Sequence, residues 1–318
     1  MSDMHSLAAD EPLEELPPDD GPADANPTAD TASALRPAWW KDAPQVGLHT
    51  SIQYDEYSRW AAINHSILRH FGRTPAHARE EMIHPAENTK AQEIGHATHV
   101  AILEPDRFER EFVSAPRIST RSNKGKAEWA EFAAAVAPRA VLPAEEHELC
   151  LRMRDAVWSH PTAAELLRGP GVNEVSAVWR DEDTGVVCKG RLDRLTTVGG
   201  WSMIVDLKTT KSAMRHSFSK DLYNYQYHQQ AAMYLDGCYA LAPHPRKYVF
   251  IAVEKEPPFL VATMELEDDA IDLGRDEYKK HLRMYADCLQ SGRWPGYDEG
   301  ISYVSLPHWA FRFHGEEG

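Results

Sequence analysis

The sequence predicts a mixed α/β sheet flanked by helices and preceded by an N-terminal helical region. Three observations lead to this expectation. Helix-forming segments dominate the chain up to Arg168, and from Gly171 short β-branched stretches separated by turn residues take over. Helical periodicity then returns between and after the later strands. This order of helices, three strands, helix, two strands and helix is typical of a sheet covered by helices.

The helical region is defined by its start and stop signals. Thr74 and Pro75 are suited to the cap and first position of a helix, and Glu104-Pro105 should end another one. The polar, basic stretch at 117–126 predicts a loop. Helices are expected at 55–61, 64–71, 75–82, 89–103, 127–136, 143–158 and 161–168.

The second half should build the sheet and its later helices. A long helix is expected at 221–240, and an amphipathic helix at 267–291 repeats its apolar residues at steps of three, four and seven. Turn signals at 183–185 and 199–200, and the proline pair at 257–258, separate the strands. Strands are expected at 172–180, 186–196, 202–207, 247–254 and 259–265.

Composition divides the chain into two parts. Residues 1–45 are rich in Asp, Glu, Pro and Ala, and we expect a disordered acidic tail there, followed by one domain at 46–318. The tail could act as a solubilising segment or compete with nucleic acid for a basic groove. Residues 1–40 carry −8 of the formal net charge of −15. The acidity argues against a nucleic-acid partner, although phosphate binding needs only a local basic surface.

Cysteine spacing and hydropathy exclude several classes of protein. Cys150, Cys188, Cys238 and Cys288 form no close pair, so a zinc or iron–sulfur cluster is not expected. The chain has no apolar run of membrane-spanning length and no secretory signal pattern. We therefore expect a protein of the reducing cytoplasm without a membrane partner.

The segment with the clearest chemistry is a predicted hairpin at 189–210. Gly199-Gly200 suits a two-residue turn, which would place Asp193 opposite Asp206 and Arg191 opposite Lys208. Side chains alternate along strands, so all four groups should project from one face. Facing carboxylates repel each other, and a divalent cation such as Mg²⁺ would relieve that repulsion. The hairpin could equally be a surface element with ordinary ion pairs.

The order of several motifs resembles the exodeoxyribonuclease VIII (RecE-like) branch of the PD-(D/E)XK nuclease superfamily. The similarity runs from about residue 50 to 312. It rests on five stretches of sequence: 95–99 with 102–105, 190–193, 206–210, 227–234, and the closing Trp294-Pro295 with Pro307-His308-Trp309. The resemblance implies a restriction-endonuclease-like fold and a metal-dependent nuclease.

The resemblance also implies roles for individual residues. Asp193 and Asp206 would be catalytic metal ligands, Lys208 the catalytic lysine, and His99 a further metal ligand. Gln230 and Tyr234 match a Gln-xxx-Tyr motif near the active site, with a spacing that places them on one helix face. His99 could instead be a core histidine, and Tyr234 could be a packing residue.

Four further residues are weaker candidates. Glu174, at the head of a strand, could be a third carboxylate ligand or support the other ligands from behind. Arg191 could neutralise the carboxylates or contact DNA. The basic loop could grip phosphates through Arg121, Lys124 and Lys126, or simply be solvated.

The expected activity is therefore Mg²⁺-dependent hydrolysis of DNA, with Mn²⁺ able to substitute for Mg²⁺. The resemblance implies an exonuclease on double-stranded ends, a homo-oligomeric ring, and a single-strand annealing protein as partner. Alternatives are an endonuclease, a nuclease for single strands or RNA, and a non-cleaving DNA-binding or assembly protein of the same fold.

Overall fold

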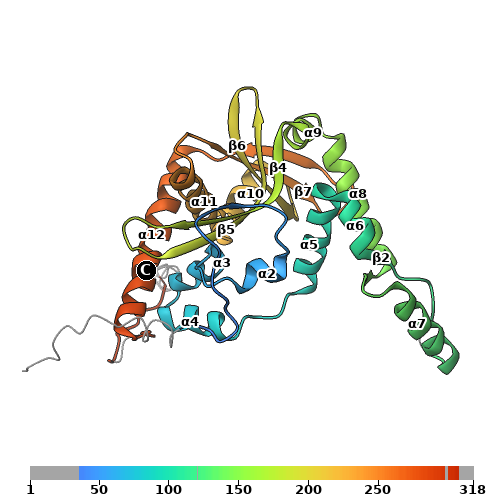
Figure 1. The fold of residues 1–318 in the computed structure, drawn as a ribbon, viewed down its shortest axis with the longest axis horizontal. Helices are drawn as coiled ribbons and strands as arrows, with labels where there is room; N and C mark the ends of the chain where they lie inside the picture. The colour runs from blue at the N-terminus through green and yellow to red at the C-terminus, as the bar shows by residue number, and fades with distance from the viewer. Residues whose placement is uncertain (1–35, 120, 298–299, 308–318) are drawn as a thin grey trace, which may run out of the picture.

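The structure, a computed structural model, describes residues 36–119, 121–297 and 300–307. The tail expected at 1–45 therefore lies mostly outside the described residues, as does the His308-Trp309 part of the closing motif. The described chain forms a mixed sheet with helices on both sides, together with a projecting arm (Figure 1). The predicted fold class is confirmed.

The central sheet has six strands in the order β1-β4-β5-β6-β7-β8. All neighbouring pairs are antiparallel except β6 and β7, which are parallel because the chain crosses over the sheet through two helices between them. The strands are β1 (Gly47–His49), β4 (Gly171–Arg180), β5 (Val187–Val198), β6 (Trp201–Thr210), β7 (Lys247–Glu254) and β8 (Val261–Glu265).

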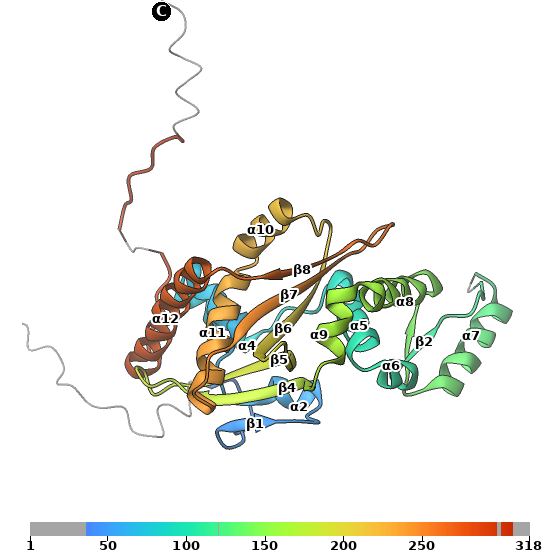
Figure 2. The same cartoon turned by 90° about the horizontal axis from the view of Figure 1, so that it is seen from above.

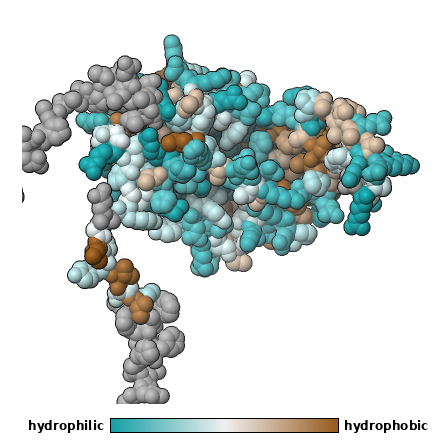
Figure 3. Space-filling model, turned by 90° about the horizontal axis from the view of Figure 1, so that it is seen from below, coloured by the Kyte–Doolittle hydropathy of each residue, from teal (hydrophilic) through white to brown (hydrophobic). Residues whose placement is uncertain are grey.

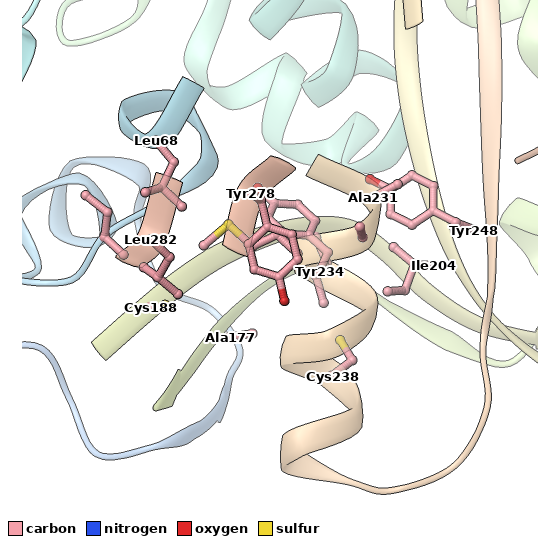
Figure 4. Packing of buried hydrophobic residues seen from close by; sticks show 14 of the residues in the cluster. Leu68, Ala177, Cys188, Ile204, Ala231, Tyr234, Cys238, Tyr248, Tyr278 and Leu282 are labelled. Atoms are coloured by element: carbon pink, nitrogen blue, oxygen red, sulfur yellow. The ribbon is translucent and has the colours of Figure 1, made fainter. Parts of the chain in front are cut away.

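Helices cover both faces of this sheet because alternate strand residues are apolar on both sides. One face packs against α11 (Tyr227–Leu241) and α12 (Asp268–Ser291), which share the largest buried cluster with Ile204 and Phe250 (Figure 4). On the other face, α5 (Lys90–Leu103), α8 (Ala144–Ser159) and α9 (Pro161–Arg168) bury Val205 and Leu207.

The N-terminal helices pack beside the first face and help to close it. They are α2 (Tyr54–Arg59), α3 (His65–Leu68), the 3-10 turn η1 (Arg69–Gly72) and α4 (Pro75–Ile83). Thr74 caps α4 as predicted, because its hydroxyl accepts from the backbone N–H of His77. Leu68, Phe71 and Met82 of these elements join the main core.

A small arm extends from the end of the molecule opposite α12 (Figure 2). It contains α6 (Pro105–Glu111), the parallel pair β2 (Phe112–Ser114) and β3 (Ala140–Leu142), and α7 (Asn123–Val136). Hydrophilic residues cover most of the face in Figure 3, and an apolar area lies toward the end that carries this arm. Trp129 and Phe132 of α7 are both partly exposed.

Several predicted boundaries are wrong. The helix expected at 221–240 is two helices, α10 (Arg215–Asn224) and α11, separated where Gln226 adopts a left-handed backbone with φ of 57°. The loop expected at 117–126 ends earlier, because Ser122 caps α7 and brings Lys124 and Lys126 into its first turn. The short elements β1, β2, β3 and α6 were not predicted, although Pro105 at the start of α6 is a usual signal.

The four cysteines are all free and buried, so no described pair of them forms a disulfide or a cluster. No helix among the described residues combines the length and apolar character that crossing a membrane requires.

Candidate active site

The candidate site forms where β5 and β6 separate. The predicted hairpin register holds from Val198–Trp201 to Arg194–Val205, and the backbone pairing then stops. Beyond that point Asp193 replaces the missing ladder bond, since its Oδ2 accepts a hydrogen bond of 2.7 Å from the backbone N–H of Leu207. The side chain of Asp193 therefore bridges the two diverging strands.

The side-chain alternation of β5 also changes at this point. Leu192 belongs to the core beside α11, whereas Arg194 donates to the carbonyl of Leu166 in α9, on the other side of the sheet. Residues 192 and 194 are two positions apart, so in a regular strand their side chains would project from the same face. On the neighbouring strand Glu174 has a left-handed φ of 53°, although it stands between the pairs Asn173–Arg194 and Val175–Leu192. The break in both strands thus centres on Glu174 and Asp193.

Asp206 and Lys208 lie on one face of β6, as alternation requires. The Nζ of Lys208 is 2.6 Å from Oδ2 of Asp206, so the two groups form a close ion pair. The Asp206 side chain is only 4% exposed and that of Lys208 15%. An ion pair this deeply buried is shielded from water and salt, so its geometry controls the charge of the site.

Burial and mutual repulsion shape the acidity of the carboxylates. Burial raises the pKa of Asp206 to about 6, and the nearby charge of Asp193 adds to the rise despite Lys208. Burial also acts to raise the pKa of Asp193, but His99 and Lys208 outweigh it and lower that pKa. The two acids therefore differ, with Asp193 the more firmly ionised.

His99 approaches the acids from α5. Its Nδ1 lies 3.6 Å from Oδ2 of Asp193, and its side chain is 24% exposed. Burial tends to lower the pKa of His99, but Asp193 raises it and the net direction is upward. Thus the structure brings the His99 imidazole next to the carboxylate of Asp193.

Glu174 lies beside the group and is held by Arg191. The Nε of Arg191 is 2.6 Å from a carboxylate oxygen of Glu174, and its guanidinium also donates to the carbonyl of Ile52. Burial and Asp193 raise the pKa of Glu174, while Arg191 lowers it. The expectation that Arg191 faces Lys208 is wrong, because β5 has left β6 before residue 191 and pairs there with Ser176 of β4.

Two residues of α11 complete the surroundings of Lys208. The Oε1 of Gln230 lies 3.4 Å from its Nζ, so the amide can steady the ammonium group. Tyr234, one turn later, is buried against Gly190 of β5, where an added Cβ would come within 2.7 Å of the ring. The Tyr234 ring therefore packs α11 against β5.

Sequence reasoning missed Tyr227, which begins α11. Its ring centroid is 4.6 Å from Nζ of Lys208, a cation–π contact. Tyr227 lies within the stretch 227–234 that carries the resemblance. Its spacing of three residues from Gln230 places both on one helix face, and this could have identified it.

The basic residues at 121–126 are not brought to the carboxylates by any described contact. Arg121, Lys124 and Lys126 are exposed on the projecting arm, and Lys124 pairs with Glu128 of the same helix at 3.8 Å. A shallow hollow between α9 and the Gly199-Gly200 turn also shares no residue with the site.

The chemistry of the donors fits a hard divalent cation. The carboxylate of Asp206 is buried and that of Asp193 is partly buried, the charge of Asp193 acts on Asp206, and an imidazole stands beside Asp193. Within the part of the chain that the structure describes, no three His, Cys, Asp or Glu side chains are already spaced as a ligand set. Lys208 holds the Asp206 oxygen instead, so a cation would have to displace part of that contact.

Comparison with known proteins identifies the family of the chain. Residues 64–307 match the family model described as "PDDEXK-like domain of unknown function (DUF3799)". The chain belongs to this family. The RecE-like branch named by the resemblance is a narrower assignment than this match supports. No curated protein matches the chain.

Solved structures extend the likeness of the fold. A protein from Eubacterium rectale described as "Putative exonuclease" is similar with a TM-score of 0.55 and 11% identity, over 85% of this chain and all of the other. SSO0001 has a TM-score of 0.24 and 18% identity over 43% of this chain and 67% of its own. VC1899 from Vibrio cholerae has a TM-score of 0.22 and 11% identity over 63% and 52%. The first likeness supports the fold, and the other two are too low to use.

Proposed function

We propose that this chain is a divalent-metal-dependent deoxyribonuclease that hydrolyses phosphodiester bonds and degrades double-stranded DNA from its ends. The observation that carries the proposal is the meeting of Asp193, Asp206 and Lys208 at the point where β5 and β6 separate. Two acids and a lysine held together at low exposure are costly for a merely structural hairpin. They are well suited to bind a cation and a phosphate.

The acids would hold the metal and the lysine would handle the attacking water. Asp193 and Asp206 are the proposed ligands, with His99 as a third and Glu174 supporting them beside Arg191. A bound Mg²⁺ would acidify a water molecule and neutralise charge on the scissile phosphate. Once it is released from Asp206, Lys208 can orient that water or contact a phosphate oxygen.

The neighbours of Lys208 define where it points. Tyr227 lies against its ammonium group and Gln230 accepts from it, so the group keeps its position when Asp206 turns to a cation. Both residues extend from the first turns of α11, which is fixed to the sheet by the buried Ala231 and Tyr234. Gln230 and Tyr227 are thus positioning residues in this proposal.

Attack from DNA ends is the finer part of the proposal and has its own test. A 3-kilobase plasmid, either linearised or as a covalently closed circle, is incubated with the protein and Mg²⁺. We expect the linear form to be degraded and the closed circle to survive, with Asp206→Asn inactive on both. Cleavage of the closed circle at a similar rate would replace the exonuclease with an endonuclease, and release of nucleotides only from single strands or RNA would redirect the substrate.

A non-cleaving DNA-binding protein is the second candidate. The formal net charge of −15 and the direct contact of Lys208 with Asp206 favour it. Calorimetric titration with Mn²⁺ separates the two, because a nuclease should bind the ion and lose that binding in Asp206→Asn. A flat titration of the unmodified protein would favour the non-cleaving candidate.

The proposed assembly follows from the resemblance to RecE-like nucleases and has a test of its own. A homo-oligomeric ring around DNA would appear as a multiple of the 35.9 kDa chain mass in light scattering. A single-strand annealing protein is the proposed partner, since it would use the strand that such an exonuclease exposes. The cytoplasm, where such DNA processing occurs, is the proposed compartment.

A further inference from the structure

The surface beside the site combines positive charge with exposed aromatic rings. Residues 207–228 contain four Lys or Arg and one Asp, in a chain whose acids outnumber its bases by 49 to 34. Of the four, Lys208 is paired with Asp206 and Arg215 with Glu267. The single acid, Asp221, is turned toward the Thr210 hydroxyl at 3.0 Å and so contributes little to the outer surface. Lys211 and Lys220 are exposed and form no ion pair with a described residue.

The exposed rings belong to α10 and the turn that follows it. Tyr223 is 66% exposed and Tyr225 is 53% exposed. His216, Lys220 and Tyr223 are spaced at i, i+4 and i+7, so they lie along one exposed face of α10. Figure 2 shows α10 standing out from the body of the molecule near β8.

Two of the rings, Tyr225 and Tyr227, form a path to the candidate catalytic lysine. Tyr225 stacks on Tyr227, with ring centroids 5.5 Å apart and planes 28° from parallel. The Tyr227 ring in turn lies 4.6 Å from Nζ of Lys208. An aromatic group stacked on Tyr225 would therefore be separated from Lys208 only by the Tyr227 ring.

The path is rigid because α10 is anchored from below. Phe218 is 1% exposed and packs edge-on against Phe250 of β7, with the Tyr227 ring also nearby. Each outer tyrosine is supported from within, because Tyr223 stacks on His228 with ring centroids 5.9 Å apart and Tyr225 stacks on Tyr227, and both rings stay more than half exposed. A stacking surface gives these residues a use.

We propose that the outer surface of α10 and of the residues on either side of it, defined by Lys211, Lys220, Tyr223 and Tyr225, binds an unpaired segment of the DNA strand whose end enters the site. Bases would stack on the two tyrosines while the lysines contact phosphates, the combination that proteins use for single strands. Bases within a duplex are stacked on both sides by their neighbours and have no free face for an aromatic side chain. The surface therefore favours unpaired nucleotides. This inference rests on the proposed nuclease function and adds the substrate form that the site receives.

The experiment measures binding apart from cleavage. Fluorescein-labelled 20-mer oligodeoxynucleotides, one single-stranded and one a blunt duplex, are titrated with the full chain in EDTA while anisotropy is recorded. The variants are Tyr223→Ala/Tyr225→Ala, Tyr223→Phe/Tyr225→Phe and Lys220→Ala. Tyr239→Ala, at another exposed tyrosine near the end of α11, and Lys280→Ala, on α12, are the matched controls. Thermal unfolding of each variant verifies that it folds.

The expected pattern is specific. The double alanine variant should lose about 10-fold or more in single-strand affinity, because each stacked base contributes about 1–3 kcal/mol, and much less in duplex affinity. The double phenylalanine variant should bind as the unmodified protein does, since the ring is kept. Lys220→Ala should weaken both ligands and lower the slope of log affinity against log salt by about 1. Both controls should be unchanged.

Three results would overturn the inference. They are equal single-strand affinity in the double alanine variant and Tyr239→Ala, equal losses for single strand and duplex, and no binding of the unmodified protein to the single strand. Failure here is distinguishable from failure of the nuclease proposal. A protein that digests linear DNA with Mg²⁺ but shows any of these results keeps the proposed function and loses only this surface.

Discussion

The ammonium group of Lys208 lies 2.6 Å from a carboxylate oxygen of Asp206, two positions away on the same face of β6. Each residue is the main partner of the other, and both are shielded from solvent. Breaking one side of such a pair leaves a buried charge without compensation, which costs more than removing both. The pair is thus a joint determinant of stability and of the proposed chemistry.

A double-mutant cycle measures this coupling. Asp206→Asn and Lys208→Met should each lower the free energy of unfolding, and the double variant should lose less than their sum, with a coupling of about 1–3 kcal/mol. Urea unfolding at pH 7.5 in EDTA gives all four values. Additive losses within about 0.5 kcal/mol would mean that the contact does not stabilise the fold.

His99 should control metal affinity rather than the chemical step. In His99→Ala we expect the Mg²⁺ concentration for half-maximal DNA digestion to rise by about 10-fold or more, with much of the rate restored at saturating Mg²⁺. The comparison is His96→Ala, an exposed histidine of the same helix that lies near Tyr54 and Phe112 instead. An identical Mg²⁺ dependence in both variants would remove His99 from the ligand set.

Gly190 should not tolerate a side chain. A Cβ at this position would meet the buried Tyr234 ring at 2.7 Å, so Gly190→Ala should destabilise the fold by about 1–3 kcal/mol in urea unfolding. Gly95 of α5 is the contrast, because its Cβ would meet only the Thr209 hydroxyl at 3.8 Å. Gly95→Ala should be neutral or stabilising by up to about 1 kcal/mol. Equal effects of the two substitutions would contradict the packing described for Tyr234.

The buried His65 should make the protein less stable in acid. Burial lowers the pKa of His65 from its ordinary value of 6.5 to about 3. Between these values the unfolded chain binds a proton that the folded chain does not, so stability falls as pH decreases from 6.5 toward 3. The contribution is about 1.4 kcal/mol per pH unit.

Replacing His65 tests that contribution directly. His65→Phe should flatten the fall in unfolding free energy between pH 6 and pH 4.5 by about that slope. The exposed His244, changed to Phe, should leave the slope as it is in the unmodified protein. If the slopes of His65→Phe and His244→Phe coincide, His65 does not titrate as the structure indicates.

The sequence predicted the turn of the hairpin well, since local rules decide it. Gly199 and Gly200 both have positive φ, and the register next to them is the predicted one. The same register extended to Arg191 and Lys208 fails, because tertiary packing ends the pairing at Arg194. Within 189–193 the local signal is Gly190, because a glycine inside a strand often marks a close approach of another element. The Tyr234 ring of α11 packs against β5 at that glycine.

Contacts between residues that are distant in the sequence decide the remaining differences between the predicted and the observed structure. Glu174 adopts a left-handed backbone with no glycine to signal it, and Gln226 breaks the predicted long helix in the same way. Such conformations persist where the surroundings hold them, and sequence patterns do not register them. His99 is the opposite case, because no local rule places it near Asp193, and it was expected there only through the resemblance.

Digestion of end-labelled linear duplex DNA in Mg²⁺, comparing the unmodified protein with Lys208→Ala, is the decisive test of the proposed active site. Lys280→Ala, at an exposed position on α12, is the matched control. The account predicts a rate loss of at least ~100-fold for Lys208→Ala, the scale of removing one well-placed catalytic group, and no loss for the control. Equal rates for the unmodified protein and Lys208→Ala would contradict it.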